Sequence, residues 1–201
     1  MAAAGTNGGR SAAVQVHRAV REAAAAWIDA AAASQGPSRL AAVDEQSLTH
    51  VDATGAARMV DVSEKQPSVR TATAAGEVGT TPEVIALLHG DGLPKGDALG
   101  VARIAGIMAA KRTPDLVPLC HPIAIHGVSV DLALDQERVT ITATVRTADR
   151  TGVEMEALTA VTVAGLALID MIKAVDPAAS IDNVRVLRKE GGKTGTWIRD
   201  E

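Results

Sequence analysis

Two stretches in the middle of the chain alternate between hydrophobic and polar residues, and a strongly apolar stretch follows them. Residues 123–134 and 138–147 have a period of two, which is typical of half-buried strands, and the polar residues between them predict a hairpin. Within the segment from Thr151 to about Val175, the stretch from Ala160 to Ile169 is almost wholly apolar. This stretch predicts a long helix, buried nearly all round, that stops before Pro177.

Weaker patterns predict the remaining elements. Thr81 followed by Pro82 is typical of a helix N-terminus, and we expect that short helix to end at Gly90. Asp97 can cap a second helix that runs to about Arg112. Three further strands are expected, at residues 58–62, 68–78 and 181–188. The resulting order β-β-α-α-β-β-α-β indicates an α+β fold, with an antiparallel sheet covered by helices on one face.

The beginning of the chain differs from the rest. It starts with small, Gly-rich residues that predict disorder, and Ser11 can then cap an Ala-rich helix that runs to about Ala33. A Gly-Pro-Ser cluster at 36–38 follows and predicts a linker. We therefore divide the chain into an N-terminal extension, 1–45, and a folded domain, 46–201. Whether the extension contributes to any chemistry is left open.

The composition excludes several classes of function. Hydrophobic residues make up 47% of the chain, yet it has no Phe, no Tyr and only two Trp. Aromatic stacking platforms for single-stranded nucleic acid, aromatic cages and aromatic membrane belts are therefore excluded. A net charge of −4 argues against a general polyanion binder but leaves room for a local cationic cluster.

The single cysteine excludes an intramolecular disulfide framework and a four-cysteine zinc site. A lone thiol suits a reducing compartment. The sequence shows no secretory leader and no uninterrupted apolar run near the roughly 18 residues of a membrane span. We expect a cytoplasmic protein that binds neither membranes nor nucleic acid.

One short loop is unusual. Pro118 and Pro122 bracket Cys120 and His121, which fixes the backbone where a loop enters a predicted strand. A rigid loop that presents an imidazole suits a general acid or base, or a phosphate contact. A purely structural histidine is an equal alternative on this evidence. Cys120 fits a packed small residue better than a nucleophile.

The long predicted helix carries charges at both ends. Glu154 and Glu156 lie in its first turn, whereas Asp170 and Lys173, three residues apart, share one face near its end. The latter pair could be a surface ion pair or part of a site. Glu156 and Asp170 are 14 residues apart, hence about 21 Å along a helix. One small substrate could contact both only at a site formed between two subunits.

Basic residues near the predicted turns could bind a phosphorylated ligand within this acidic chain. They are Arg70, Lys95, Lys111 and Lys193, with Lys173 on the long helix. Lys111 could instead complement a helix dipole. Lys193 could equally lie in a solvated turn.

Several segments together resemble the cyclic pyranopterin monophosphate synthase family of molybdenum cofactor biosynthesis. The resemblance covers about Ser47 to Thr196. The most specific segments are Pro118-Leu-Cys-His-Pro122 and Gly152-Val-Glu-Met-Glu-Ala-Leu-Thr159. The others are Leu48-Thr-His50, Arg58-Met-Val-Asp-Val62, Lys95-Gly-Asp97, Ala102-Arg-Ile-Ala-Gly106, Ala109-Ala-Lys-Arg-Thr113, Asp170-Met-Ile-Lys-Ala-Val175 and Gly191-Gly-Lys-Thr-Gly195.

This resemblance implies an enzyme, a lyase with a ferredoxin-like fold. Family members rearrange a cyclised dihydroguanosine triphosphate, 3',8-cyclo-7,8-dihydro-GTP, into cyclic pyranopterin monophosphate and release pyrophosphate. They assemble as homohexamers, trimers of dimers, with active sites at the dimer interface. No resident cofactor or metal is implied, although Mg²⁺ could accompany the triphosphate.

The resemblance also implies roles for individual residues. The catalytic residues would be Asp170, Lys173 and Lys95, and the substrate-binding residues would be Leu119, Cys120, His121, Met155, Glu156, Glu154, Arg70, Lys111 and Lys193. The chain departs from the family pattern in two places. The extension, 1–45, has no counterpart, and Arg58 stands where a His is common.

Two other functions remain open at the level of sequence. A metal-dependent nucleotide phosphohydrolase could use the side chains of His121, Glu154, Glu156 and Asp170 as ligands, although these lack the tight spacing of a carboxylate metal site. A non-catalytic sensor of GTP-like ligands could use the same pocket without converting its ligand.

Overall fold

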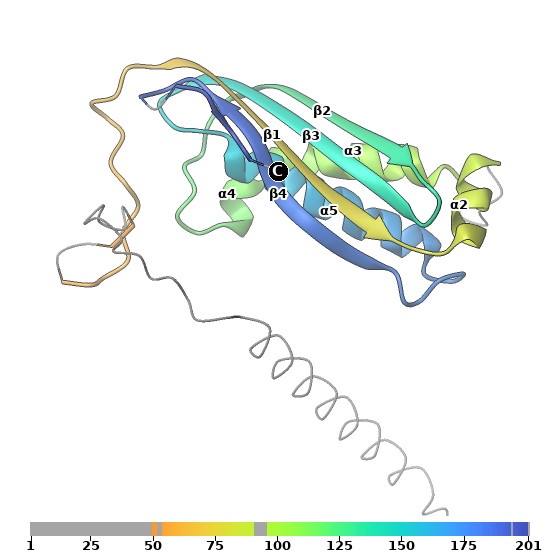
Figure 1. The fold of residues 1–201 in the computed structure, drawn as a ribbon. Helices are drawn as coiled ribbons and strands as arrows, with labels where there is room; N and C mark the ends of the chain where they lie inside the picture. Colours follow the sequence, from red (N-terminus) through yellow and green to blue (C-terminus); the bar gives the residue numbers. More distant parts are fainter. Residues whose placement is uncertain (1–49, 52–53, 91–95, 194, 201) are drawn as a thin grey trace, which may run out of the picture. The chain divides into compact units, whose positions relative to one another are not determined.

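The centre of the fold is a five-stranded antiparallel sheet, seen in a computed structural model that describes residues 50–51, 54–90, 96–193 and 195–200. Its strands are β1 (Ser68–Gly79), β2 (Ile125–Leu134), β3 (Arg138–Asp149), β4 (Ser180–Glu190) and β5 (Trp197–Ile198). They lie in the order β2-β3-β1-β4-β5 (Figure 1). In the last pair, Trp197 lies opposite Lys189.

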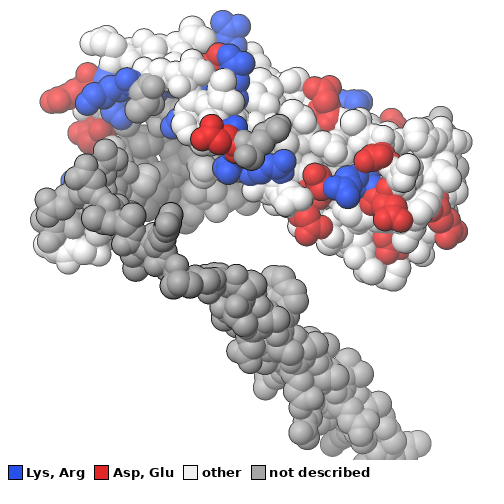
Figure 2. Space-filling view, viewed as in Figure 1, with Lys and Arg blue, Asp and Glu red and all other residues white. Residues whose placement is uncertain are grey.

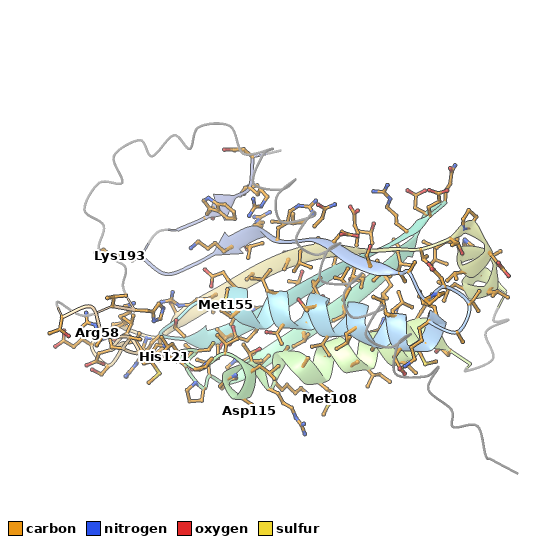
Figure 3. All side chains as sticks on the ribbon, turned by 90° about the horizontal axis from the view of Figure 1, so that it is seen from below. Arg58, Met108, Asp115, His121, Met155 and Lys193 are labelled. Carbon is orange, nitrogen blue, oxygen red and sulfur yellow. The ribbon has the colours of Figure 1, made fainter. Side chains whose placement is uncertain are left out.

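Two helices cover one face of this sheet. The helices of the described region are α2 (Pro82–His89), α3 (Ala98–Ala110), α4 (Thr113–Leu116) and α5 (Glu154–Ile172). Figures 1 and 3 show α3 and α5 side by side on the same face, with α2 and α4 at opposite ends. Strands β1 to β4 with α3 and α5 follow the β-α-β-β-α-β order of a ferredoxin-like fold. The α+β prediction is therefore confirmed.

The predicted helix N-termini of α2 and α3 are confirmed. The Thr81 hydroxyl accepts a hydrogen bond from the Val84 amide at 3.4 Å, and Pro82 occupies the first turn. The Asp97 carboxylate accepts a hydrogen bond from the Gly100 amide at 2.7 Å. Both caps could be predicted from the sequence because each capping residue and its partner lie within one turn.

The prediction for α5 was wrong in two respects. The helix begins at Glu154, after Val153, and not at Thr151; Val153 makes no side-chain cap. It is also not buried all round, because Leu166 is 61% exposed within the single chain. Only one face of a helix can reach the sheet and α3, so an apolar sequence on every side still leaves one face open. That face ends at Asp170 and Lys173.

The strand expected at residues 58–62 does not form. This segment lies outside the sheet, next to an isolated bridge between Val51 and Ala57. The Val60 carbonyl instead accepts a hydrogen bond from His121. The alternating sequence matched a strand, but its hydrogen-bond partner is the Cys-His loop, which no local pattern reveals. The short elements α4 and β5 were not predicted either.

The core is built from small aliphatic side chains. Ala74, Ala102, Ala143, Ala160 and Ala164 are each fully buried. At Gly106 of α3 an added Cβ would lie 2.8 Å from the Ala160 carbonyl oxygen of α5. The two helices therefore pack closely, and only glycine fits at this point of contact.

Helix α5 is, within the described residues, long and apolar enough to cross a membrane by length and composition. It packs against α3 and against β1, β3 and β4, as the central helix of the domain. The predicted Ala-rich helix in 1–45 lies outside the described residues, as does Lys95.

Candidate active site

The Cys-His loop runs from the end of α4 to β2 and packs on the first turn of α5. The Cys120 amide donates to the Val117 carbonyl at 3.0 Å, which closes the turn before the cysteine. Thr147 of β3 donates its hydroxyl to the Ala124 carbonyl at 2.6 Å and fixes the other end. The two prolines thus bracket a loop that is held at both ends, as its sequence predicted.

A cavity of about 400 Å³ opens beside this loop. Its walls come from the loop, from the start of α5 and from the segment that precedes β1. The lining residues are His50, Val60, Val62, Lys65, Val117, Leu119, Cys120, His121, Thr151 and Met155. Figure 3 shows His121, Arg58 and Met155 at the same end of the sheet. We call this space the loop cavity.

A second cavity, of about 620 Å³, has three cationic side chains in its lining. It is lined by Lys65, Gln66, Ser68, Arg70, Gly192 and Lys193, and we call it the cationic pocket. Lys65 lines both cavities, so the two adjoin. Figure 2 shows acidic and basic side chains interspersed over one face of the molecule, with several acidic ones toward the α2 end. The local cationic cluster that the net charge left open therefore exists.

Arg70 is fixed within the cationic pocket. Its Nε donates to the Asp149 carbonyl at 3.0 Å, which directs the remaining guanidinium nitrogens toward Gly192. Gly192 has φ +73°, and an added Cβ there would lie 2.2 Å from Arg70 Nη1. The glycine pair before Lys193 thus makes room for the guanidinium. The hydroxyl of Ser68 is buried and has no hydrogen-bond partner in the described structure.

Glu156 is buried under the loop. Only 1% of it is exposed; Oε1 accepts a hydrogen bond from the Cys120 thiol at 3.4 Å, and Oε2 has no hydrogen-bond partner within the described structure. Burial raises the pKa of Glu156 above its ordinary value. Burial, and then the Glu156 carboxylate, raise the pKa of Cys120 to about 11. The cysteine is therefore a neutral thiol at neutral pH, in line with its prediction as a packed residue.

Glu154 faces away from the loop cavity. Its carboxylate pairs with Lys189 of β4 at 3.2 Å and lines a small recess of about 70 Å³ beside Arg70. The ion pair joins the start of α5 to the sheet. Glu154 therefore lies next to the cationic pocket and not beside His121.

Asp170 and Lys173 lie at the far end of α5. Lys173 Nζ is 2.7 Å from Asp170 Oδ1, and both side chains are more than half exposed. They border an apolar groove of about 410 Å³ lined by Val163, Leu166 and Ile169. With about 1.5 Å per residue, the helix itself separates this pair from Glu156 by about 21 Å. One chain does not bring the two ends together.

Comparison with known proteins gives the family. The family model described as the MoaC family matches residues 59–192, more than half of the chain. The chain belongs to the MoaC family. The matched range contains all but one residue of each cavity, because His50 of the loop cavity precedes it and Lys193 of the cationic pocket follows it.

Three relatives show how much of the chain the likeness covers. A protein of Streptomyces coelicolor named cyclic pyranopterin monophosphate synthase is 63% identical over 155 residues, 77% of this chain and 91% of its own length. Cyclic pyranopterin monophosphate synthase 2 of Mycobacterium tuberculosis H37Rv is 64% identical over 76% of this chain and 91% of its own length. A synthase of the same name from Pelobacter propionicus is 54% identical over 77% of this chain and 98% of its own length.

The two adjoining cavities gather most of the residues expected from the sequence. Leu119, Cys120, His121 and Met155 line the loop cavity, with Glu156 buried beneath it, while Arg70 and Lys193 line the adjoining pocket. Lys111 ends α3, exposed and outside the lining of both cavities. Asp170 and Lys173 lie at the other end of α5, away from both cavities, as their spacing from Glu156 along the helix predicted.

Sequence reasoning missed two residues that line the loop cavity. His50 was noted only as part of a motif, and Lys65 was not noted at all, although both line the loop cavity. Lys65 stands in an exposed turn whose sequence resembles any solvated loop. Its position between the two cavities follows from the path of the chain before β1, which local patterns do not encode.

Proposed function

We propose that this MoaC-family chain converts 3',8-cyclo-7,8-dihydro-GTP into cyclic pyranopterin monophosphate, with release of pyrophosphate, and that the two adjoining cavities bind the substrate. One observation carries the proposal: a pocket with three cationic side chains opens beside a cavity that presents His121, and Lys65 lines both. The substrate has the same two parts, a triphosphate joined to a bicyclic ring system. The relatives are named cyclic pyranopterin monophosphate synthase, and this name supports the identity of the proposed product.

The cationic pocket would hold the triphosphate. Lys65, Arg70 and Lys193 supply positive charge, and the planar guanidinium of Arg70 suits phosphate oxygens. The unpaired Ser68 hydroxyl adds a buried donor. These groups would stabilise the charge that develops as pyrophosphate leaves.

The loop cavity would hold the ring system. Leu119 and Met155 give it apolar walls, and His121 gives it a hydrogen-bonding group. Because the chain has no Phe and no Tyr, the ring would be recognised by polar groups at its edge and not by stacking. Glu156 is too deeply buried in this arrangement to contact the ring, so it would act by supporting the loop that lines the cavity.

Asp170 and Lys173 would act on a substrate bound to a second copy of the chain. Their 2.7 Å ion pair orients the ammonium group, and Lys173 together with Lys95 would transfer protons as the rings rearrange. Both ends of α5 can reach one substrate only from different chains. The exposed apolar groove beside Asp170 supports such a contact, since burial of Leu166 would stabilise it.

The proposed assembly is a homohexamer built as a trimer of dimers, with active sites at the dimer interface. Residues 46–201 would form the synthase domain, and 1–45 an extension to it. We also propose a cytoplasmic location, which the free thiol of Cys120 supports. The substrate would bring any Mg²⁺ with its phosphates.

The two alternative functions have less support. For a metal-dependent phosphohydrolase the carboxylates should converge. Instead, Glu154 pairs with Lys189, Glu156 with Cys120, and Asp170 lies at the other end of α5. The described residues contain no group of three or more potential metal-binding side chains. A non-catalytic sensor remains an outcome of the experiment below.

The test is a product assay with the full chain. Purified protein is incubated with 3',8-cyclo-7,8-dihydro-GTP, and the oxidised fluorescent pterin and the released pyrophosphate are measured together. We expect equal amounts of both, and loss of both with Lys173→Ala. Pyrophosphate or phosphate without the pterin would indicate a phosphohydrolase. Binding without conversion would indicate a sensor, and either result would overturn the proposal.

A further inference from the structure

Two histidines are held by alternate carbonyls of one segment. His121 Nε2 lies 2.7 Å from the Val60 carbonyl oxygen, and His50 Nδ1 lies 3.3 Å from that of Arg58. The Arg58 amide also donates to the His50 carbonyl at 2.8 Å, so the backbone of His50 is fixed as well as its ring. The segment that failed to form a strand thus anchors both rings.

These contacts determine which nitrogen of each ring carries hydrogen. A backbone carbonyl only accepts, so His50 Nδ1 and His121 Nε2 must be the donors. In a neutral imidazole the other nitrogen is an acceptor. Among the residues that the structure describes, neither His50 Nε2 nor His121 Nδ1 makes a hydrogen bond. Each ring therefore has one acceptor left for a ligand.

Both rings line the loop cavity, and Lys65 lies between them and the cationic pocket. The cavity thus offers two imidazole acceptors beside a site for phosphate. A reduced bicyclic ring derived from guanine carries several N–H groups at its edge, which need acceptors when they leave water. Met155 and Leu119 supply none, so the acceptors must come from polar side chains or backbone.

We propose that His50 is a further substrate-contacting residue, whose Nε2 accepts a hydrogen bond from an N–H group of the ring system bound in the loop cavity. His121 Nδ1 provides a second acceptor in the same cavity. This inference rests on the proposed function, because it takes the ring system as the ligand. The carbonyl groups of Arg58 and Val60 would determine the tautomers of His50 and His121.

The decisive variant is His50→Asn. The side-chain amide of Asn reaches the position of Nδ1 and keeps the bond to the Arg58 carbonyl, but places nothing at Nε2. We expect an unchanged melting temperature and a kcat/KM lower by about tenfold, the cost of leaving one buried ligand N–H unpaired. His50→Gln, which restores an acceptor near Nε2, should recover part of the loss. His89→Asn, at the exposed end of α2, is the matched control and should behave as wild type.

A second readout does not depend on turnover. Nitrogen-15 NMR of the ligand-free protein should show His50 protonated at Nδ1 and His121 at Nε2. Adding the product should shift the His50 Nε2 resonance in the wild type. The opposite tautomer of His50, or wild-type kcat/KM in His50→Asn, would overturn the inference while leaving the proposed function intact. If wild-type protein gave no product at all, the proposed function would fail, and this inference with it.

Discussion

The Cys120 thiol lies 3.4 Å from Oε1 of Glu156, and this contact connects the Cys-His loop to the first turn of α5. It is a contact between a weak donor and a buried carboxyl group whose second oxygen has no hydrogen-bond partner in the described structure. The loop cavity therefore rests on an ionisable group whose charged form is disfavoured by burial, which raises its pKa.

Replacing Glu156 with Gln should stabilise the protein at neutral pH. Burial raises the pKa of Glu156, so the charged form is disfavoured on folding. The free energy of unfolding therefore gains a contribution from this group that is complete at pH values below the ordinary carboxyl pKa. That contribution is lost as the pH rises through the raised pKa. Denaturant unfolding of wild type and Glu156→Gln at several pH values should show a gain for the variant near pH 7 that disappears in acid. Glu154→Gln, which removes only the partly exposed pair with Lys189, should show no such gain.

Cys120 should be slow to react with alkylating agents. With a pKa of about 11 the thiol is almost wholly protonated at neutral pH, and only the thiolate is nucleophilic. The rate of iodoacetamide labelling of the native chain should rise steadily up to about pH 11. Cys120→Ala should keep most of the turnover. A variant without measurable product would show that the thiol has a chemical role.

Lys65→Ala should weaken binding of inorganic pyrophosphate by about tenfold, because one cation of the pocket is lost. Isothermal titration calorimetry at two salt concentrations measures this, and the loss should be smaller at high salt. The control is Arg138→Ala, at the start of β3, which removes an exposed arginine paired with Glu77. Equal losses in both variants would show that only the overall charge matters.

Gly192→Ala should displace Arg70. The added Cβ would collide with Arg70 Nη1, and the positive φ adds strain of about 1 kcal/mol. Gly195→Ala is the matched control, since Gly195 has φ +68° and nothing within 4 Å of the added Cβ. We expect similar losses of stability in both variants but weaker pyrophosphate binding only in Gly192→Ala. Calorimetry and thermal unfolding separate these two effects.

Two inactive variants should restore activity when mixed. In an isologous dimer, His121→Ala and Lys173→Ala chains combine so that one site of each mixed dimer has both wild-type residues. After unfolding and refolding an equal mixture, turnover should return to about a quarter of the wild-type value, from random pairing. A site complete within one chain would give no recovery. Each variant refolded alone is the control.

The sequence revealed those parts of the structure that depend on neighbours along the chain. Thr81 and Asp97 cap helices because their partners are three residues away. The hairpin between β2 and β3 followed from alternation and a short polar turn. The bracketed loop was recognised because two prolines restrict the backbone locally.

Contacts between distant segments could not be predicted from local patterns. Residues 58–62 were expected to join the sheet, but the Val60 carbonyl bonds to His121, 61 residues later. Lys65 and His50 enter the site for the same reason. The burial of Glu156 could not be predicted from local patterns either, since it depends on the loop that covers the side chain. The separation of Asp170 from Glu156, in contrast, followed from helix geometry alone.

The position of Trp197 has a practical consequence. It is 41% exposed on β5, opposite Lys189, which pairs with Glu154 beside Arg70. With no Tyr and no Phe in the chain, the core contains almost no ultraviolet chromophore of its own. Emission from Trp197 would report events near the phosphate end of the site. Because the chain has only two Trp and no Tyr, its near-ultraviolet absorption is confined to the indole bands, and the conversion of a bound pterin could be followed optically outside them in real time.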